Sequence, residues 1–132
     1  MISRPAQLKT GLWIDAIIRR AESAGAFAVI ARSGDRDAGS VLVMVRQSQQ
    51  LTLFVPERNW DGIRVWRAQS GSDVELAKVI EGRADFDPDL NVIEIDDPKG
   101  RHFIEEPVLD PEGSQDDGAD AVAVARALFR DR

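Results

Sequence analysis

The sequence predicts an α/β fold in which a mixed, mainly antiparallel sheet of about five strands lies between two helices. Three observations lead to it. Five short runs rich in β-branched and aromatic residues are separated by turn-forming residues, which is typical of strands. Two other segments combine an apolar stripe with helix-capping residues. One central run is apolar at successive positions, so both faces of its sheet should be covered, and we expect a three-layer α/β/α arrangement.

The first helix is expected over residues 12–24. Its apolar positions cover more than half of its circumference, which predicts close packing against the sheet. Thr10 is the expected N-cap, and Gly25 is the expected residue of left-handed conformation after the last turn.

Four strands are expected next, at residues 27–32, 41–46, 51–55 and 63–68. The sequences SGDRDAG and QSQQ, which separate the first three strands, are rich in turn formers. We therefore expect these three strands to form antiparallel hairpins.

The second helix is expected over residues 73–84, opened by the capping box that Ser72 and Glu75 form in the pattern S-x-x-E. It would cross over to a further strand at residues 90–96. Residues 101–106 could add a short terminal strand.

The chain of 132 residues, 43% of them apolar, suits one domain, which we place at residues 1–106. Residues 107–118 hold turn formers and acids with little to bury, which predicts a flexible linker. Residues 119–132 predict a C-terminal amphipathic helix, which is too short to be stable alone in water. It should dock either on its own domain or on a second copy of the chain. Docking on a second copy would form a homodimer. The docking side chains would be Val122, Ala125, Leu128 and Phe129.

The composition excludes several classes of site. Cysteine is absent, so disulfides, thiolate metal sites and cysteine nucleophiles are excluded. No apolar run suits a signal peptide or reaches the roughly 20 residues of a membrane span. We expect a cytoplasmic protein without a membrane partner, and no pattern points to a cofactor.

The net charge of -6 is unevenly distributed. The first 66 residues hold nine basic and six acidic side chains, whereas the remaining 66 hold eight and seventeen. Such polarity could guide a basic partner to the second half of the chain.

The acidic segment 85–106 is the first candidate site. Glu94 and Asp96 should share one face of a strand, and this acidic cluster at 94 to 97 could hold Mg²⁺ or Mn²⁺ in a metal-dependent hydrolase. Lys99 could stabilise a developing charge, and His102, the single histidine, could act as a general base oriented by Glu94 or Asp96.

The same segment also has part of the spacing of a calcium-binding EF-hand loop. Leu90 occupies the position at which that loop needs glycine, and Pro88 stiffens the backbone, so the pattern is incomplete. The oxygen-bearing side chains at the ligand positions are Asp85, Asp87, Asp89, Asn91 and Asp96.

A second candidate site interleaves arginine and tryptophan over residues 58–67, a composition that could stack on a base or pair with phosphates. The net charge argues against nucleic acid. Strand alternation puts Arg64 and Trp66 on one face, where we expect Trp66 to pack beneath a helix. The candidate partner-binding residues are Arg58, Trp60, Arg64 and Trp66, together with Phe129 of the C-terminal helix.

The sequence from LKTGLW to VLVMVR, followed by FDPDLNVIEIDDPKGRHFIEEP, resembles a bacterial family of small proteins known as domain of unknown function 1491. The resemblance covers roughly residues 7–107, and its distinctive motifs are FDPDL, VIEIDD and GRHF. It implies a single-domain intracellular α/β protein and supplies no activity, cofactor or catalytic residue. Asn91 stands where the family is expected to prefer a large apolar side chain.

No motif completes an active site. Our leading hypothesis is therefore a non-enzymatic interaction module whose partner meets the acidic edge or the C-terminal helix. The alternatives are the metal-dependent hydrolase and a nucleic-acid-binding accessory protein that uses residues 58–67.

Overall fold

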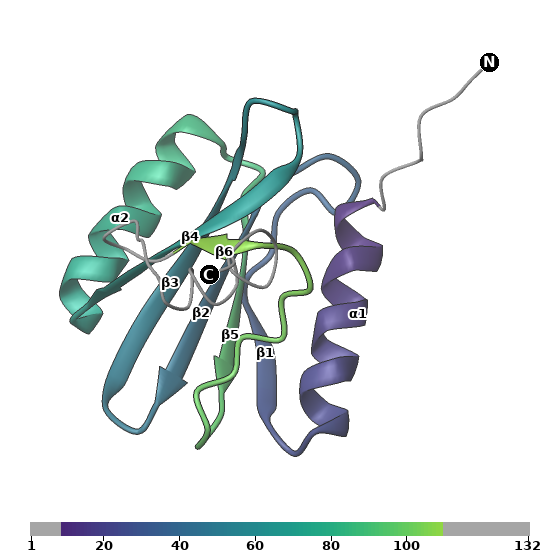
Figure 1. The fold of residues 1–132 in the computed structure, drawn as a ribbon. Coiled ribbons are helices and arrows are strands. Elements are labelled where there is room, and N and C mark those ends of the chain that lie inside the picture. Colours follow the sequence, from purple (N-terminus) through teal and green to yellow (C-terminus); the bar gives the residue numbers. More distant parts are fainter. Residues whose placement is uncertain (1–8, 110–132) are drawn as a thin grey trace, which may run out of the picture.

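The computed structural model of the protein describes residues 9–109, which form two helices and six strands (Figure 1). In chain order these are α1 (Thr10–Ser23), β1 (Phe27–Arg32), β2 (Val41–Gln47), β3 (Gln50–Arg58), β4 (Arg64–Gly71), α2 (Asp73–Phe86), β5 (Asn91–Asp96) and β6 (Val108–Leu109). The α/β class is as predicted. The strand count is six because β6, within the stretch expected to be a linker, joins the sheet.

The six strands form one open, mixed sheet in the order β1-β5-β2-β3-β4-β6. Strand β3 is antiparallel to both of its neighbours, β2 and β4, and β1 is antiparallel to β5. The pairs β2–β5 and β4–β6 are parallel.

The hairpin predicted between β1 and β2 does not form, because β5 lies between these two strands. Both β2 and β5 carry apolar side chains on two faces, and their central places in the sheet bury them there. The crossover through α2 brings β5 into this place. The other predicted hairpin, between β2 and β3, is confirmed.

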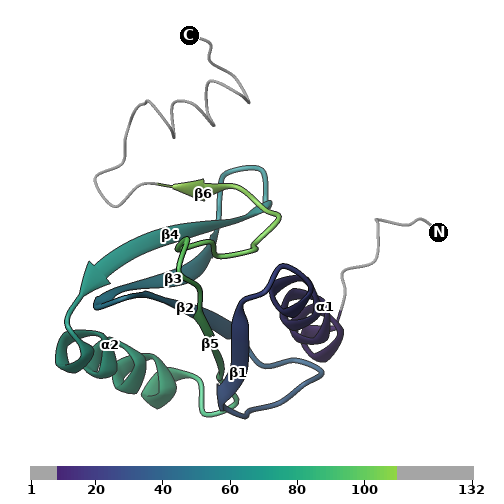
Figure 2. The same ribbon diagram turned by 90° about the horizontal axis from the view of Figure 1, so that it is seen from below.

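Two apolar cores lie on opposite faces of the sheet. Ile14 and Ile17 of α1 pack with Ile93 and other residues in one cluster. Leu76 of α2 packs with Val92 and other residues in the second. Because Val92 and Ile93 are consecutive strand residues, their side chains point to opposite faces. Figure 2 shows the two helices on opposite sides of the strands accordingly.

The helix ends agree with the sequence in part. Gly25 has the expected positive φ, 90°, and the Ser72–Glu75 capping box of α2 is present. Thr10 is not the N-cap of α1: the helix begins with it, after Lys9. Its hydroxyl instead donates a hydrogen bond to the carbonyl oxygen of Gly39 at 2.7 Å. This bond ties α1 to the loop before β2.

Residues 101–106 form no strand and cross the α1 side of the sheet to reach β6 (Figure 1). The rest of the expected linker and the predicted helix at 119–132, with Phe129, lie outside the described residues. No helix between residues 9 and 109 is long and apolar enough to cross a membrane.

Candidate functional site

Glu94 and Asp96 project from β5 on the α2 side of the sheet, since they alternate with Ile93 and Ile95 of the α1-side core. Glu94 lies 3.4 Å from the guanidinium of Arg46, which also bonds Asp73 at 3.2 Å. The hydrogen bond to Asp73, assisted by Glu94, raises the pKa of Arg46. Glu94 is therefore part of an ion-pair network at the start of α2, whereas Asp96 is exposed.

Asp97, the last member of the acidic cluster at 94 to 97, is fully buried. Its carboxylate accepts two side-chain hydrogen bonds from Arg101, at 2.7 and 3.0 Å, and one from the Arg101 backbone N–H at 2.8 Å. These bonds hold the pKa of Asp97 far below its ordinary value. Arg101 also donates to the carbonyl oxygen of Ala24, so the pair fastens this turn to the end of α1.

His102 packs on Phe54, with ring centroids 5.0 Å apart, and its Nδ1 accepts a hydrogen bond from the Ile104 N–H at 2.9 Å. Burial lowers its pKa. Phe54 belongs to the α1-side core, so His102 and Glu94 lie on opposite faces of the sheet. Glu94 and Asp96 therefore do not orient His102 as the general-base hypothesis requires.

Lys99 is exposed in the turn between Asp97 and Arg101. Between residues 9 and 109, no group of three His, Asp or Glu side chains is arranged to hold a metal ion. The structure thus does not bring the four candidates of the acidic segment, Glu94, Asp96, Lys99 and His102, into one site.

Two oxygen-bearing side chains of the EF-hand-like segment, Asp87 and Asn91, fasten the loop between β1 and β2, whereas Asp85, Asp89 and Asp96 are exposed. Asp87 accepts from the backbone N–H of Ser40 at 3.1 Å. Hydrogen bonding with the Ser40 side chain is the main cause of its lowered pKa, and the backbone bond to Ser40 lowers it further. Asn91 is buried: it accepts from Gly34 N–H at 2.7 Å and donates to the carbonyl oxygens of Asp35 and Ser40. The polar residue at position 91 is thus explained by the loop it holds, a long-range role that local sequence patterns do not reveal.

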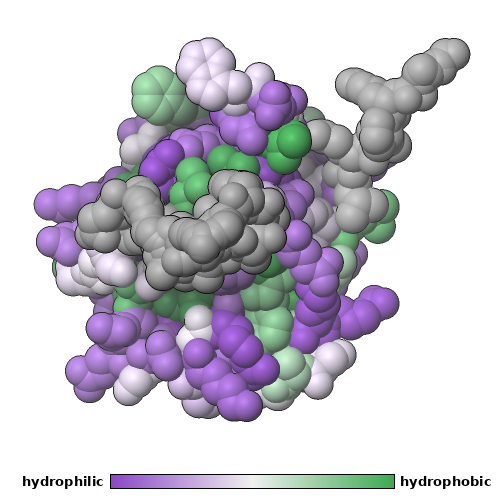
Figure 3. Space-filling view, viewed as in Figure 1, coloured by the Kyte–Doolittle hydropathy of each residue, from purple (hydrophilic) through white to green (hydrophobic). Residues whose placement is uncertain are grey.

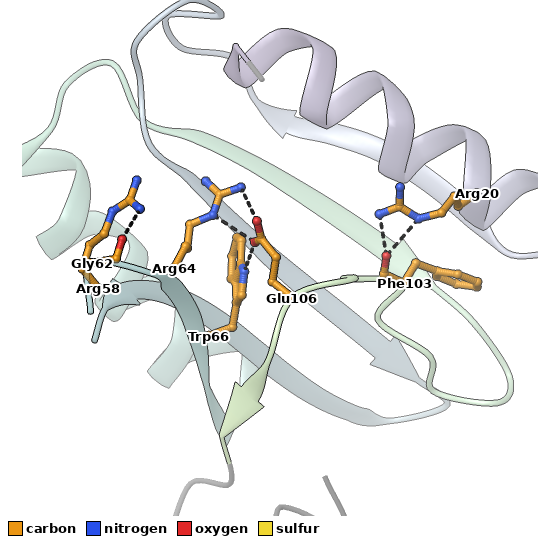
Figure 4. A network of polar contacts seen from close by, with 7 residues as sticks. All are labelled: Arg20, Arg58, Gly62, Arg64, Trp66, Phe103 and Glu106. Atoms are coloured by element: carbon orange, nitrogen blue, oxygen red, sulfur yellow. Dashed lines mark hydrogen bonds and ion pairs between the residues drawn. The ribbon is translucent and has the colours of Figure 1, made fainter. Parts of the chain in front are cut away.

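Arg64 and Trp66 belong to a structural clamp rather than to an open site (Figure 4). Trp66 is fully buried, as expected, and stacks on Trp13 of α1 with centroids 5.3 Å apart. The Arg64 guanidinium lies over both rings and pairs with Glu106 at 2.9 Å. Glu106 also accepts from the indole Nε1 of Trp66 at 2.7 Å. No sequence pattern singles out Glu106, which lies 40 residues from Trp66 in the chain.

Arg58 ends β3 and lies opposite Arg64 of β4, and Trp60 lies in the turn between these two strands. The Arg58 guanidinium donates to the carbonyl oxygen of Gly62 at 2.8 Å (Figure 4), whereas Trp60 is fully exposed. The arginine–tryptophan segment therefore divides into a buried part and an exposed hairpin.

The exposed apolar side chains point to a different surface, along β1. Eight large hydrophobic residues of the described part of the chain are exposed, and three of them, Phe27, Val29 and Ile30, belong to this one strand. The other five are distributed over α1, α2 and the loop between β3 and β4. On the face seen in Figure 3, hydrophobic areas are interrupted by hydrophilic ones.

On the α2 side of the sheet, β1 and β5 form an apolar strip bordered by acids. Phe27 is 73% exposed and lies opposite Asp96, and Val29 is 47% exposed and lies opposite Glu94. Within residues 9–109, β1 pairs with β5 alone, so its other edge is open. We call Phe27, Val29 and Asp96 with this edge the β1 surface.

The chain matches the model of a protein family of unknown function, DUF1491, over residues 8–105. A crystal structure of a DUF1491 family protein from Caulobacter crescentus is 44% identical, covers 77% of this chain and 99% of its own, and has a TM-score of 0.72. An NMR structure of a DUF1491 family protein from the same organism is 42% identical, covers 79% and 98%, and has the same TM-score. A protein from A. tumefaciens is similar at 25% identity, with 76% and 95% covered and a TM-score of 0.66. No curated protein matches the chain.

Proposed function

This chain belongs to the DUF1491 family, whose function is unknown, and we propose that it is a non-enzymatic interaction module that binds an extended segment of a partner protein along β1. The observation that carries the proposal is the exposure of Phe27 and Val29 on a strand that, within the described part of the chain, is paired on one side only. An open strand edge can take up a further strand, whose backbone supplies affinity and whose side chains supply specificity.

The edge of β1 lacks most of the features that normally block strand addition, namely proline, charged side chains and short length. Its sequence, FAVIAR, has one charge, at Arg32. The Arg32 guanidinium donates hydrogen bonds to the carbonyl oxygens of Leu90 and Pro88. It is therefore bound to the turn before β5. A bulge after Ile30 interrupts the ladder there, which leaves residues 27–30 as the regular part of the edge.

The side chains of the β1 surface suggest the chemistry of the partner. Phe27 and Val29 would contact apolar residues of an added strand, while Asp96 has no side-chain partner among residues 9–109. A segment that carries apolar residues and a basic residue at alternate positions, all on its α2-side face, would satisfy both groups. Strand β5, which supplies Asp96 beside β1, belongs to the acidic second half of the chain, which supports attraction of such a segment.

Two finer features belong to the same proposal. We propose a three-layer α/β/α domain, which the two cores on opposite faces support. We also propose a location in the cytoplasm of a bacterium, which is supported by the bacterial origin of the similar solved proteins and by the absence of cysteine.

The test is a titration of the ¹⁵N-labelled protein with a Lys–Val peptide of about six residues, the usual strand length, in which Val, Val and Lys stand at alternate positions on one strand face and Ser stands between them. We expect the amide signals of residues 27–32 to shift and to become protected from hydrogen exchange. Val29→Lys should weaken binding about tenfold or more, since it removes an apolar contact and adds a repulsive charge. Phe86→Lys is the matched control, because Phe86 is 93% exposed at the end of α2.

A Glu–Val peptide of equal length should leave the spectrum unchanged. If the Lys–Val peptide shifts no β1 amide at millimolar concentration, or if Phe86→Lys weakens binding as much as Val29→Lys, the proposal is wrong. Light scattering at rising protein concentration tests the homodimer: a dimer that Val29→Lys dissociates would identify a second copy as the added strand.

A further inference from the structure

A groove of about 460 Å³ lies between α2 and the strands β3 and β4, away from β1. Val55 of β3 and Val79 of α2 supply apolar lining, and Gln69 and Ser70 of β4 supply neutral polar groups. Two arginines, Arg67 of β4 and Arg83 of α2, also line it, and Glu57 is the single carboxylate among the lining residues that the structure describes. The volume lies within the range of small-molecule sites.

The charges of this groove are unbalanced. Arg67 pairs with Glu57 at 2.6 Å across the two strands, and this bond uses one of the five N–H donors of its guanidinium. The Arg83 side chain has no ion-pair or hydrogen-bond partner among residues 9–109. Two cations therefore face one anion in a protein whose net charge is -6.

We propose that this groove binds a small ligand that carries a carboxylate or phosphate on an apolar body. The anionic group would bind Arg83 and the remaining donors of Arg67, because guanidinium groups match the planar geometry of such anions. The apolar body would contact Val55 and Val79, and the side chains of Gln69 and Ser70 would orient neutral polar groups of the ligand. This site is independent of the β1 surface.

The test uses benzoate as probe on the full-length ¹⁵N-labelled protein, with benzamide as its neutral counterpart. Benzoate should shift the amide signals of residues 67–70 and 79–83, and benzamide should not. Arg83→Gln should weaken benzoate binding about tenfold to a hundredfold, since it removes a charged hydrogen-bonding partner. Arg19→Gln is the matched control: it removes the same charge from an exposed position of α1.

Equal weakening in Arg19→Gln and Arg83→Gln would reduce the effect to net charge and overturn the proposal, as would absence of binding to the full-length protein. The chain's own acidic residues after Leu109, among them Asp110 and Glu112, are the rival occupant. A chain that ends at Leu109 should fold, because the DUF1491 family protein of the crystal structure is folded and covers 77% of this chain with 99% of its own. If this truncation alone shifts the groove signals and only the truncated chain binds benzoate, the occupant is the C-terminal segment and not a free ligand.

Discussion

The carboxylate of Glu106 accepts a 2.7 Å hydrogen bond from the indole Nε1 of Trp66, a side chain with no exposed surface. The same carboxylate binds Arg64, and the next residue, Pro107, accepts the backbone N–H of Trp66 at 2.9 Å. One glutamate thus fastens the segment that leads into β6 to the stacked tryptophans under α1. The contact joins the last described strand to the core.

Glu106→Ala should therefore lower the free energy of unfolding by about 2 to 3 kcal/mol, since it leaves the buried Trp66 N–H without an acceptor and Arg64 without its partner. Glu106→Gln keeps an acceptor for the indole and should cost less. Chemical denaturation followed by tryptophan fluorescence measures both. Glu105→Ala is the control, because Glu105 is exposed and its 3.5 Å pair with Arg20 should contribute less than about 1 kcal/mol. Equal losses at 105 and 106 would contradict the clamp.

The strands and helices could be predicted from the sequence because their signals are local. The apolar run at 27–32 and the capping box at Ser72 suffice to locate β1 and α2. The order of the strands could not be predicted in this way. The insertion of β5 between β1 and β2 depends on burial of residues about 60 positions apart, and a turn-rich loop such as 33–40 is equally compatible with a hairpin and with a wider connection.

Asp97→Asn should destabilise the protein by roughly 2 to 3 kcal/mol at neutral pH, because charge-assisted hydrogen bonds to Arg101 are lost. Asp96→Asn, one residue earlier and exposed, should change stability by less than about 0.5 kcal/mol. Thermal unfolding compares the two variants with the parent protein.

The effect of Asp97 should also depend on pH. Its folded-state pKa lies below the ordinary value of 3.8, so its contribution is fully present above that value and is lost as the pH falls toward the folded-state pKa. The stability difference between the parent and Asp97→Asn should therefore be constant from pH 5 to 7 and shrink below about pH 4. A difference that stays constant down to pH 2 would show that the charge of Asp97 is not its cause.

The candidate sites were less predictable than the fold, because an acidic or arginine-rich segment has the same sequence pattern whether its charged side chains form ion pairs or are exposed to solvent. Glu94 and Arg64 are paired, with Arg46 and Glu106, while Asp96 and Trp60 are exposed. The sequence predicts that Trp66 is buried, because alternation is local. It does not identify Phe27 as exposed, since an apolar strand residue is exposed only if its strand lies at an edge, and edge position is a property of the whole sheet.

His102 should titrate with a pKa below 6.5, because burial disfavours its charged form. The imidazole signals in proton NMR measure this directly. The lowered pKa means that the unfolded state takes up the proton first, so the unfolding free energy should fall as the pH drops from 6.5 toward the folded-state pKa. His102→Gln should remove this part of the pH dependence. A midpoint at or above 6.5 would contradict the packing of the ring on Phe54.

The same glycine-to-alanine change should have opposite effects at two positions. A Cβ at Gly39 would clash with the carbonyl oxygen of Asp89, so backbone atoms of the β1–β2 loop and of the turn before β5 must separate. We expect Gly39→Ala to destabilise the protein by more than about 2 kcal/mol. Gly82 lies inside α2 with open space around its Cβ position.

Gly82→Ala should therefore stabilise the protein by about 0.5 to 1 kcal/mol, because alanine loses less backbone entropy than glycine in a helix. Thermal unfolding of Gly39→Ala and Gly82→Ala in the same buffer measures whether each change lowers or raises the stability of the protein. Faster hydrogen exchange at Gly34 and Asn91 in Gly39→Ala would locate its effect in the loop that Asn91 holds. If Gly39→Ala unfolds at the temperature of the parent protein, the close approach of the loop to Asp89 does not constrain position 39.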